Sequence, residues 1–172
     1  MIDIHNHIIP GIDDGAVDIS MALEMLGMAE SQGITHLVCT PHMHPGRFDN
    51  DGGSIALAFA RLQEAVCQTR LSIQLAMAAE VRMTDELIVQ LAQDKVPFVG
   101  RWQGRPALLL EMPHSRIPTG IEKLLVWLQQ QNIQPVIAHP ERNKEIMSTP
   151  PVRYGIGGKW GLDAADGRSH YG

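Results

Sequence analysis

Side chains that could bind divalent metal ions recur along this chain, each at or near the end of a short apolar segment. His5 and His7 stand two residues apart in the first of these segments. Because side chains repeat every two residues on one face of a strand, both imidazoles are expected to point in the same direction. Two converging neutral imidazoles suit a divalent ion such as Zn²⁺, Mn²⁺ or Fe²⁺. Taken alone, the pair also fits two surface histidines on an edge strand.

Further imidazole and carboxylate groups occupy comparable positions later in the sequence. They are His42, Glu80, Glu111 and His139, with Asp14 in an Asp-Asp-Gly sequence just after the first segment. Nitrogen and oxygen ligands that converge from several strands resemble a hydrolytic centre with more than one metal ion. The metal interpretation requires that side-chain atoms of His5, His7, Glu80, Glu111 and His139 come within about 5 Å of a common centre. Three other histidines are left outside it: His36 and His114, interpreted as structural or solvated, and His44, which is ambiguous.

Glu80 and Glu111 each have a second interpretation. Both follow or lie in apolar segments that are expected to be buried, where an unpaired carboxylate is costly. Each one either binds a metal ion or forms a structural ion pair with an arginine that is near in the sequence. The candidate arginines are Arg82, Arg101 and Arg105.

Two arginines are candidates for binding a phosphoryl group. Arg142 lies three residues after His139, and Arg47 lies in the polar loop after His42. The planar guanidinium group can hold two phosphate oxygens at once, which suits the entrance of a cationic metal site. The alternative for both is a solvated surface arginine.

The two cysteines do not fit a cysteine-dependent phosphatase. Such an enzyme needs a thiolate and an arginine at a fixed short spacing in one phosphate-binding loop. Here seven residues separate Cys39 from Arg47 and two separate Cys67 from Arg70, and neither spacing matches. Cys39 is interpreted as a small buried strand residue. The sequence also lacks the Gly-x-x-x-x-Gly-Lys-Ser/Thr loop of nucleoside-triphosphate enzymes.

Composition excludes several other classes of protein. The chain has 172 residues, of which 44% are hydrophobic and 19% charged, as expected of one globular domain. A net charge of −5 and an aromatic content of 5% argue against a nucleic-acid partner. No apolar run approaches the roughly 20 residues that a membrane span needs, and no secretory signal is visible. Two cysteines make no disulfide framework, so we expect a cytoplasmic protein.

Strand and helix patterns alternate around the candidate ligands. This alternation predicts a parallel sheet with helical crossovers, covered on both faces. In such folds functional groups lie at the carboxyl ends of the strands, where the imidazoles and acids fall here. The predicted strands are 1–7, 35–40, 71–79, 106–112 and 134–139, and the predicted helices are 18–32, 54–70, 84–93 and 119–132, with Ser54 and Thr84 as candidate N-caps.

Several short motifs, taken in order, resemble one known family. They are Met-Ile-Asp-Ile-His-Asn-His at the start, Thr-Pro-His at 40–42, Ala-Glu at 79–80, Leu-Glu-Met at 110–112 and Ala-His-Pro-Glu-Arg at 138–142. The pattern is similar to that of the CpsB/CapC-like protein-tyrosine phosphatases of the PHP (polymerase and histidinol phosphatase) superfamily, which belong to bacterial capsular and exopolysaccharide clusters. The resemblance covers roughly residues 1–150.

The resemblance implies an α/β fold, namely a distorted TIM-like (β/α)7 PHP barrel. It implies Mn²⁺-dependent hydrolysis of phosphotyrosine on a bacterial tyrosine kinase that regulates polysaccharide synthesis. Two or three ions would be bound, with Fe²⁺ or Zn²⁺ as alternatives, and Arg142 would hold the substrate phosphate. The implied metal ligands are His5, His7, Asp14, His42, Glu80, Glu111 and His139.

The chain departs from this family after His139. The family supplies an Asp-x-His metal pair near its C-terminus, whereas no Asp-x-His follows His139 in this sequence. We therefore expect a PHP domain over 1–150 whose barrel is incomplete at the C-terminus. Segment 151–172 is rich in glycine and lacks a sustained apolar pattern. We hypothesise that this tail is translated from a shifted reading frame, which the gene sequence would decide.

Two other functions stay open. The first is a PHP phosphoesterase that acts on a small phosphomonoester. The second is an inactive remnant that acts only as a metal-binding or kinase-binding module, because a barrel without its final strands exposes a sheet edge.

Overall fold

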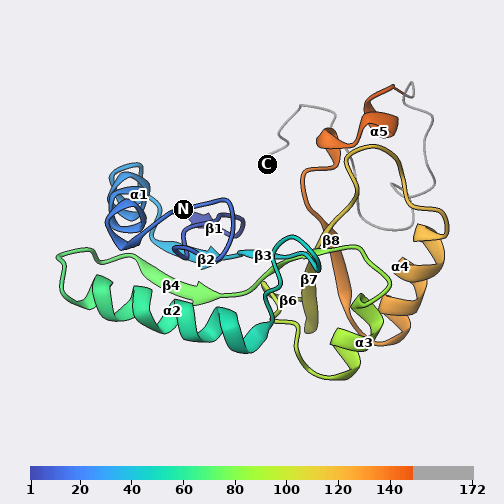
Figure 1. The fold of residues 1–172 in the computed structure, drawn as a ribbon, viewed down its shortest axis with the longest axis horizontal. Helices are drawn as coiled ribbons and strands as arrows, with labels where there is room; N and C mark the ends of the chain where they lie inside the picture. Colours follow the sequence, from blue (N-terminus) through green and yellow to red (C-terminus); the bar gives the residue numbers. More distant parts are fainter. Residues whose placement is uncertain (149–172) are drawn as a thin grey trace.

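Strands and helices alternate along the chain in the computed structural model, and Figure 1 shows their arrangement. The structure describes residues 1–148. In chain order the elements are β1 (Ile2–Asp3), α1 (Ile19–Ser31), β2 (His36–Cys39), β3 (His42–Met43), α2 (Gly52–Cys67), β4 (Gln74–Met77), β5 (Glu80–Arg82), α3 (Leu87–Ala92), β6 (Gly100–Trp102), β7 (Arg105–Glu111), α4 (Ile121–Gln130), β8 (Gln134–Ile137), the 3-10 helix η1 (Pro140–Arg142) and α5 (Lys144–Ser148).

The strands form two sheets. In the first, β1, β2 and β4 pair in that order and both pairs are parallel. In the second, the order is β3-β5-β7-β6 with β8 also paired to β7, and only the β6–β7 pair is antiparallel. Figure 1 shows the first sheet with α1 and α2 in one half of the molecule and the second sheet with α3 and α4 in the other. The predicted α/β class is confirmed, although the strands within residues 1–148 form two sheets and no closed barrel.

Two neighbouring segments run from the first sheet into the second and bring ligand candidates side by side. Two residues separate β2 from β3, and two residues separate β4 from β5. Across these gaps, the Ala78 N–H donates to the Cys39 carbonyl (2.8 Å) and the Glu80 N–H donates to the Pro41 carbonyl (3.0 Å). His42 is therefore the direct register partner of Glu80. The strand predicted over 71–79 corresponds to β4 alone, and a second short strand, β5, begins at Glu80.

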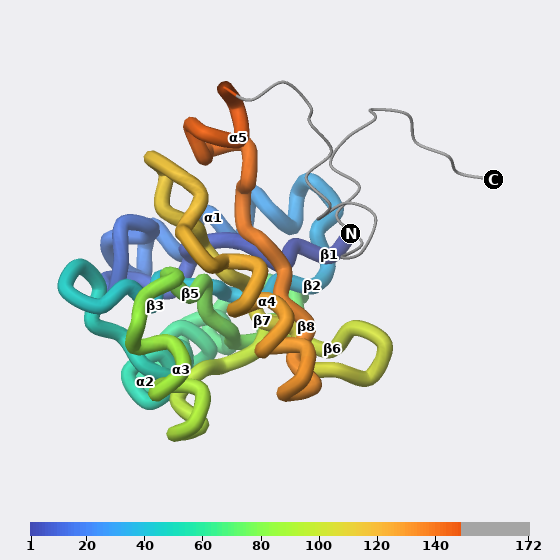
Figure 2. The backbone as a smooth tube through the Cα atoms, turned by 90° about the vertical axis from the view of Figure 1, so that its right-hand side faces the viewer, coloured from blue at the N-terminus to red at the C-terminus, as the bar shows by residue number. Residues whose placement is uncertain are grey.

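The central strand of the second sheet, β7, carries Glu111 at its carboxyl end. Ala107, Leu108, Leu109 and Leu110 are all buried, so both faces of the strand are covered, while β5 and β8 pair with its edges. Burial of both strand faces explains the continuous apolar pattern from which this strand is predicted. Figure 2 shows β8 running beside β7 before the chain continues towards α5.

Side-chain caps determine where the first two helices begin. Asp18 accepts a hydrogen bond from the Met21 N–H (2.9 Å) at the start of α1, which agrees with the predicted boundary. The second helix begins at Gly52, earlier than predicted, because Asp51 is its N-cap and Ser54 completes a capping box. The prediction of Ser54 as the N-cap is therefore wrong by three residues.

Other local predictions also differ from the structure. β1 ends at Asp3, so the predicted strand 1–7 is too long and its two histidines lie in the following loop. The predicted helix over 84–93 begins at Leu87 without a side-chain cap. β6, which forms a hairpin with β7, has no counterpart among the predicted strands. The segment 151–172, with its hypothesised shift of reading frame, lies outside the described residues.

The largest fully buried side chains mark the core and include one acid. The apolar members are Ile9, Leu26, Leu37, Met43, Ile55, Leu62, Val81, Leu87, Leu108, Leu110 and Leu128. Glu80 is also 0% exposed, which is rare for a carboxylate unless it is paired or binds a metal ion. No helix among residues 1–148 has both the length and the apolar character to cross a membrane.

Candidate metal centre

The buried carboxylate of Glu80, at the start of β5, is the centre of the candidate site. Its Oε2 lies 3.1 Å from His5 Nε2, 3.3 Å from His7 Nε2 and 3.4 Å from His42 Nδ1. Its Oε1 lies 2.6 Å from His139 Nε2. Four imidazoles from three separate segments of the chain therefore surround one carboxylate.

Two more carboxylates border this cluster through His42. Glu111 Oε2 lies 3.8 Å from His42 Nδ1, and Asp14 Oδ1 lies 3.5 Å from His42 Nε2. Three sets of ligand atoms have all their members within 4.8 Å of one another: His5, His7 and Glu80; His7, Asp14 and His42; and His42, Glu80 and Glu111. The sets share residues, as in centres where neighbouring ions stabilise one reacting group.

Three buried polar atoms in this cluster form no well-aligned hydrogen bond, although Glu80 Oε2 lies close to two imidazoles. The three atoms are His42 Nδ1, Glu80 Oε2 and Glu111 Oε2. Burying a polar atom without a partner is costly, and two carboxylate oxygens that share a buried site repel each other. A divalent cation would satisfy all three atoms at once, and a mixed nitrogen and oxygen set suits Mn²⁺, Fe²⁺ or Zn²⁺. The side chains present therefore fit a metal centre.

The loop after β1 is held against the end of β2. The Asn6 N–H donates to Thr40 Oγ1 (2.9 Å), and the Thr40 hydroxyl donates to the Asn6 carbonyl (3.0 Å). His5 and His7 flank Asn6, so this anchor lets both rings reach Glu80 although neither residue lies on a strand.

Asp13, rather than its neighbour Asp14, orients the ring of His7. Asp13 Oδ2 lies 2.7 Å from His7 Nδ1 and also accepts a hydrogen bond from the His42 backbone N–H (3.0 Å). Since Nδ1 of His7 faces Asp13, its Nε2 faces Glu80. A carboxylate behind the ring is a common support for a metal-binding imidazole. Sequence reasoning missed Asp13, because two adjacent carboxylates do not show which one faces the histidine.

Gly15 allows this turn to pack directly against His7. The Gly15 N–H donates to Asp13 Oδ1 (3.0 Å), and the Ala16 N–H donates to the His7 carbonyl (2.9 Å). A Cβ atom at Gly15 would collide with the His7 carbonyl oxygen, so a larger residue would push the turn away.

Burial and charge shift the pKa values of the cluster in opposite directions. Burial lowers the pKa of His7, but the hydrogen bond with Asp13 and the contact with Glu80 outweigh it and raise the pKa to about 9. Burial raises the pKa of Glu80, but its contacts with His5 and His7 hold the pKa well below the usual range. Burial lowers the pKa of His42, which favours the neutral imidazole. A metal ion that binds near neutral pH must therefore displace a proton from His7.

His139 reaches the cluster from a strained backbone position after β8. Its φ of 28° lies in a region that residues with a side chain rarely adopt. The ring stacks against His5 with 5.4 Å between the ring centroids, and Nε2 points at Glu80. Strain of this kind persists only where surrounding contacts hold it, and it is frequent at functional sites.

Both arginines predicted to bind phosphate are exposed. Arg47 Nη2 lies 3.3 Å from Asp14 Oδ2, and its guanidinium lies 4.9 Å from the centre of the Phe48 ring. Phe48 in turn stacks on His42, which places Arg47 beside the cluster. The guanidinium of Arg142 forms no ion pair or side-chain hydrogen bond with any residue of the described part of the chain.

The ion-pair alternative applies to one of the two buried acids. Glu111 Oε1 lies 2.9 Å from Arg82 Nη1, while Oε2 of the same carboxylate faces the cluster. Within residues 1–148 no arginine pairs with Glu80, and neither Arg101 nor Arg105 pairs with either acid. For Glu111, an ion pair and an oxygen that faces the cluster thus coexist.

His114, which is interpreted from the sequence as structural or solvated, lies at the border of the cluster. His114 Nε2 lies 3.3 Å from Glu111 Oε1, and its ring centre is 6.0 Å from that of His139. Its side chain is 53% exposed, so it lies at the rim of the cluster. His36 is exposed and contacts Thr35, away from the cluster.

Comparison with known proteins identifies the family of this chain. The model of the family described as "Capsular polysaccharide synthesis, CpsB/CapC" matches residues 1–153. The chain belongs to the CpsB/CapC family. The resemblance drawn from the sequence motifs is thereby confirmed.

Two curated members of the CpsB/CapC family illustrate the relationship. The chain is 35% identical over 147 residues to CapC of Staphylococcus aureus, an alignment that covers 86% of this chain and 56% of CapC. It is 34% identical over 154 residues to the tyrosine-protein phosphatase YwqE of Bacillus subtilis, covering 90% of this chain and 59% of YwqE. The chain thus spans a little over half the length of these relatives.

A solved structure from the CpsB/CapC family shares the fold. A chain from the crystal structures of YwqE from Bacillus subtilis and CpsB from Streptococcus pneumoniae, described as metal-dependent tyrosine phosphatases, superposes with a TM-score of 0.79. The two sequences are 34% identical, and the match covers 87% of this chain and 60% of the other.

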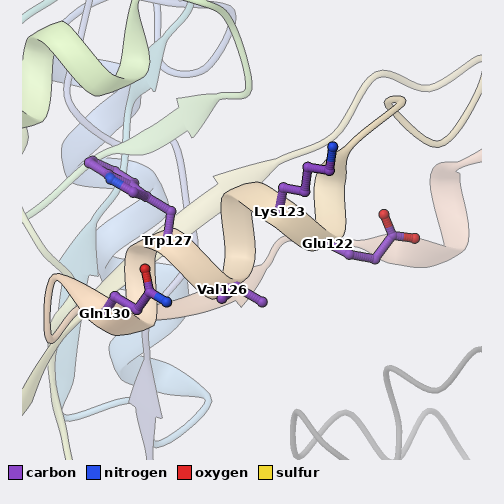
Figure 3. A pocket seen from close by; sticks show the side chains of 5 residues that line it. All are labelled: Glu122, Lys123, Val126, Trp127 and Gln130. Atoms are coloured by element: carbon purple, nitrogen blue, oxygen red, sulfur yellow. The ribbon is translucent and has the colours of Figure 1, made fainter.

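Neither Cys39 nor a surface hollow on α4 offers an alternative to the candidate centre in this CpsB/CapC-family chain. Burial raises the pKa of Cys39 to about 12, so its thiolate is not available at neutral pH. The hollow has a volume of about 280 Å³ and shares no residue with the cluster. Figure 3 shows that its lining residues all project from one helix: Glu122, Lys123, Val126, Trp127 and Gln130.

Proposed function

We propose that this CpsB/CapC-family chain carries metal-binding machinery for the hydrolysis of phosphotyrosine. The observation that carries the proposal is the convergence of imidazoles and carboxylates on the buried Glu80, with unpaired polar atoms at the point where they meet. The proposed metal ligands are His5, His7, Asp14, His42, Glu80, Glu111 and His139. A relative named as a tyrosine-protein phosphatase and a structural match described as metal-dependent support this reaction.

The proposed cofactor is a set of two or three Mn²⁺ ions, with Fe²⁺ or Zn²⁺ as alternatives. Three sets of ligand atoms support this number, and their mixed nitrogen and oxygen character supports these metals. When bound, divalent ions neutralise phosphate oxygens and acidify water, which is the chemistry that phosphomonoester hydrolysis needs. Asp163, Asp166 and His170 lie outside the described residues and receive no role.

Individual side chains bind the substrate phosphate, orient a metal ligand and supply negative charge. Arg142 binds the substrate phosphate with its exposed guanidinium, and Arg47, beside Asp14, is a second phosphate contact. Asp13 keeps Nε2 of His7 directed at the cluster. Glu80 stays ionised at neutral pH, so its carboxylate is ready to bind cations.

Finer features of the family extend the proposal. The two sheets are part of a distorted (β/α)7 barrel of the PHP type. The substrate is a tyrosine-phosphorylated bacterial tyrosine kinase that regulates capsular or exopolysaccharide synthesis, and the reaction takes place in the cytoplasm. The description of the matching family, which refers to capsular polysaccharide synthesis, supports this role.

Release of phosphate from a phosphotyrosine peptide tests the proposal. We expect the purified chain to hydrolyse the peptide with Mn²⁺, to lose this activity with a chelator, and to prefer the peptide to small phosphomonoesters. Replacing Arg142 with alanine should lower kcat/KM by at least about 100-fold, as the loss of a charged donor to a reacting phosphoryl group does elsewhere. The matched control is Arg116→Ala, because Arg116 is also exposed but forms no ion pair with Glu80 or Glu111.

The same assay separates the alternatives. Faster turnover of small phosphomonoesters than of the peptide would replace the proposed substrate with a small molecule. Binding of Mn²⁺ without hydrolysis of either substrate would contradict the proposed activity and leave a binding module.

A further inference from the structure

Arg82 is an arginine that touches the cluster without belonging to any set of candidate ligands. It lies on β5 two residues after Glu80, so both side chains are on the same face of the strand. Its register partner on the parallel strand β7 is Glu111. The pairing of the two strands therefore determines that Arg82 and Glu111 meet beside the cluster.

Contacts with the side chain and the backbone hold the guanidinium of Arg82 in place. Arg82 Nη1 lies 2.9 Å from Glu111 Oε1, and the same nitrogen donates to the Met112 carbonyl (3.0 Å). The Arg82 side chain is 17% exposed and that of Glu111 is 5% exposed, so solvent screens this pair only weakly.

The two oxygens of Glu111 have different partners. Oε1 faces Arg82 and His114, whereas Oε2 is buried, has no hydrogen-bond partner and lies 3.8 Å from His42 Nδ1. Without Arg82 the carboxylate would be free to rotate, and either oxygen could turn away from the cluster. The ion pair leaves one orientation, in which Oε2 is offered to the cluster.

We infer that Arg82 is a positioning residue, which binds Oε1 of Glu111 so that Oε2 is directed at the metal ion shared with His42 and Glu80. The inference rests on the proposed function, since it assumes that the cluster binds metal. It gives the Arg82–Glu111 ion pair a role in metal affinity rather than in fold stability alone. Partners behind a ligand typically contribute about 10-fold to 100-fold to metal affinity.

Arg82 differs from the arginines proposed to bind phosphate. Arg142 is exposed and its guanidinium has no ion-pair partner within residues 1–148, whereas Arg82 is already bound to a carboxylate and a carbonyl. We therefore expect substitution of Arg82 to weaken metal binding and substitution of Arg142 to leave it unchanged.

Titration of the full chain with Mn²⁺, followed calorimetrically, tests this role through a double-mutant cycle. Arg82→Gln should weaken the binding of one ion by about 10-fold to 100-fold. In a Glu111→Gln background, the same substitution should cause no further loss, because Arg82 acts through Glu111. Arg105→Gln is the matched control, since Arg105 is exposed on β7 and pairs with neither buried acid.

Each outcome of the titration decides between the two proposals. If the unmodified chain binds Mn²⁺ and Arg82→Gln binds it equally well, the inference about Arg82 is wrong while the metal centre stands. The inference is also wrong if Arg82→Gln weakens Mn²⁺ binding by the same factor in the unmodified chain and in the Glu111→Gln background. If the unmodified chain binds no divalent ion, both proposals fail together.

A conservative variant covers the case in which Arg82→Gln does not fold. Arg82→Lys keeps the positive charge but loses the planar guanidinium fork. We expect it to keep the circular dichroism spectrum of the unmodified chain and to bind the affected ion several-fold more weakly. An unchanged affinity in this folded variant would contradict the inference.

Discussion

Replacing Glu80 with glutamine is expected to remove at least two of the bound metal ions, because two of the three ligand sets contain this carboxylate. The affinity for these two ions should fall by at least about 100-fold, a larger loss than that caused by removing a residue behind a ligand. We also expect the free energy of unfolding of the metal-free variant to fall by about 3 kcal/mol, because breaking a buried ion pair leaves its partner uncompensated. Metal content by mass spectrometry and denaturant unfolding check the two effects.

The matched control for this substitution is Glu64→Gln. Glu64 lies exposed on α2, and its replacement makes the same chemical change away from the cluster. We expect the control to keep both its metal content and its stability. A Glu80→Gln protein that bound the full number of ions would show that the buried carboxylate is only a structural acid.

Metal affinity is expected to fall steeply as the pH falls. The pKa of His7 is raised from its ordinary value of 6.5 to about 9, so below that pH an ion that binds His7 must compete with a proton on this imidazole. Competition with one proton weakens binding about 10-fold per pH unit, or about 100-fold between pH 8 and pH 6. Calorimetric titrations with Mn²⁺ in buffers of different ionisation enthalpy measure both the affinity and the proton released.

The stability of the metal-free protein should change in the opposite direction. His7 has a raised pKa, so its contribution to stability is complete below pH 6.5 and is lost as the pH rises through about 9. Glu80 has a lowered pKa, so its contribution is present above pH 4.5 and is lost only as the pH falls well below that value. Metal-free protein should therefore gain stability between pH 9 and pH 6.5, while metal affinity declines. An affinity that stayed constant from pH 8 to pH 6, with no proton release, would contradict this description of His7.

The location of most candidate ligands could be predicted because it depends on local patterns. Glu111 ends β7, and His42 and Glu80 lie three residues after the ends of β2 and β4, so all three lie at or near the carboxyl ends of parallel strands. The structure indeed places these three side chains together. The helix beginning after Asp18 could also be predicted, because its cap is next to it in the sequence.

The parts that could not be predicted depend on contacts between distant segments. Asp13 and Asp14 are equivalent in the sequence, and only the packing of Gly15 against His7 decides which one orients the ring. The partner of Glu111 was one of three nearby arginines, and the strand register selects Arg82.

The length of β1 depends on a distant contact in the same way. Its early end follows from the attachment of Asn6 to Thr40, which lies 34 residues away in the sequence. A two-residue spacing of histidines predicts a shared strand face, but here a loop brings both rings to Glu80. The histidine spacing thus correctly predicts that the two rings lie together, but the structural reason is a loop and not a strand.

Anomalous diffraction from crystals of this protein soaked in Mn²⁺ tests the central claim most directly. We predict peaks within bonding distance of Glu80 Oε2, at the point where the rings of His5, His7 and His42 converge, and these peaks should disappear in Glu80→Gln crystals. Crystals that bound Mn²⁺ only on surface carboxylates, with water or a hydrogen-bonded side chain between the imidazoles, would contradict the account.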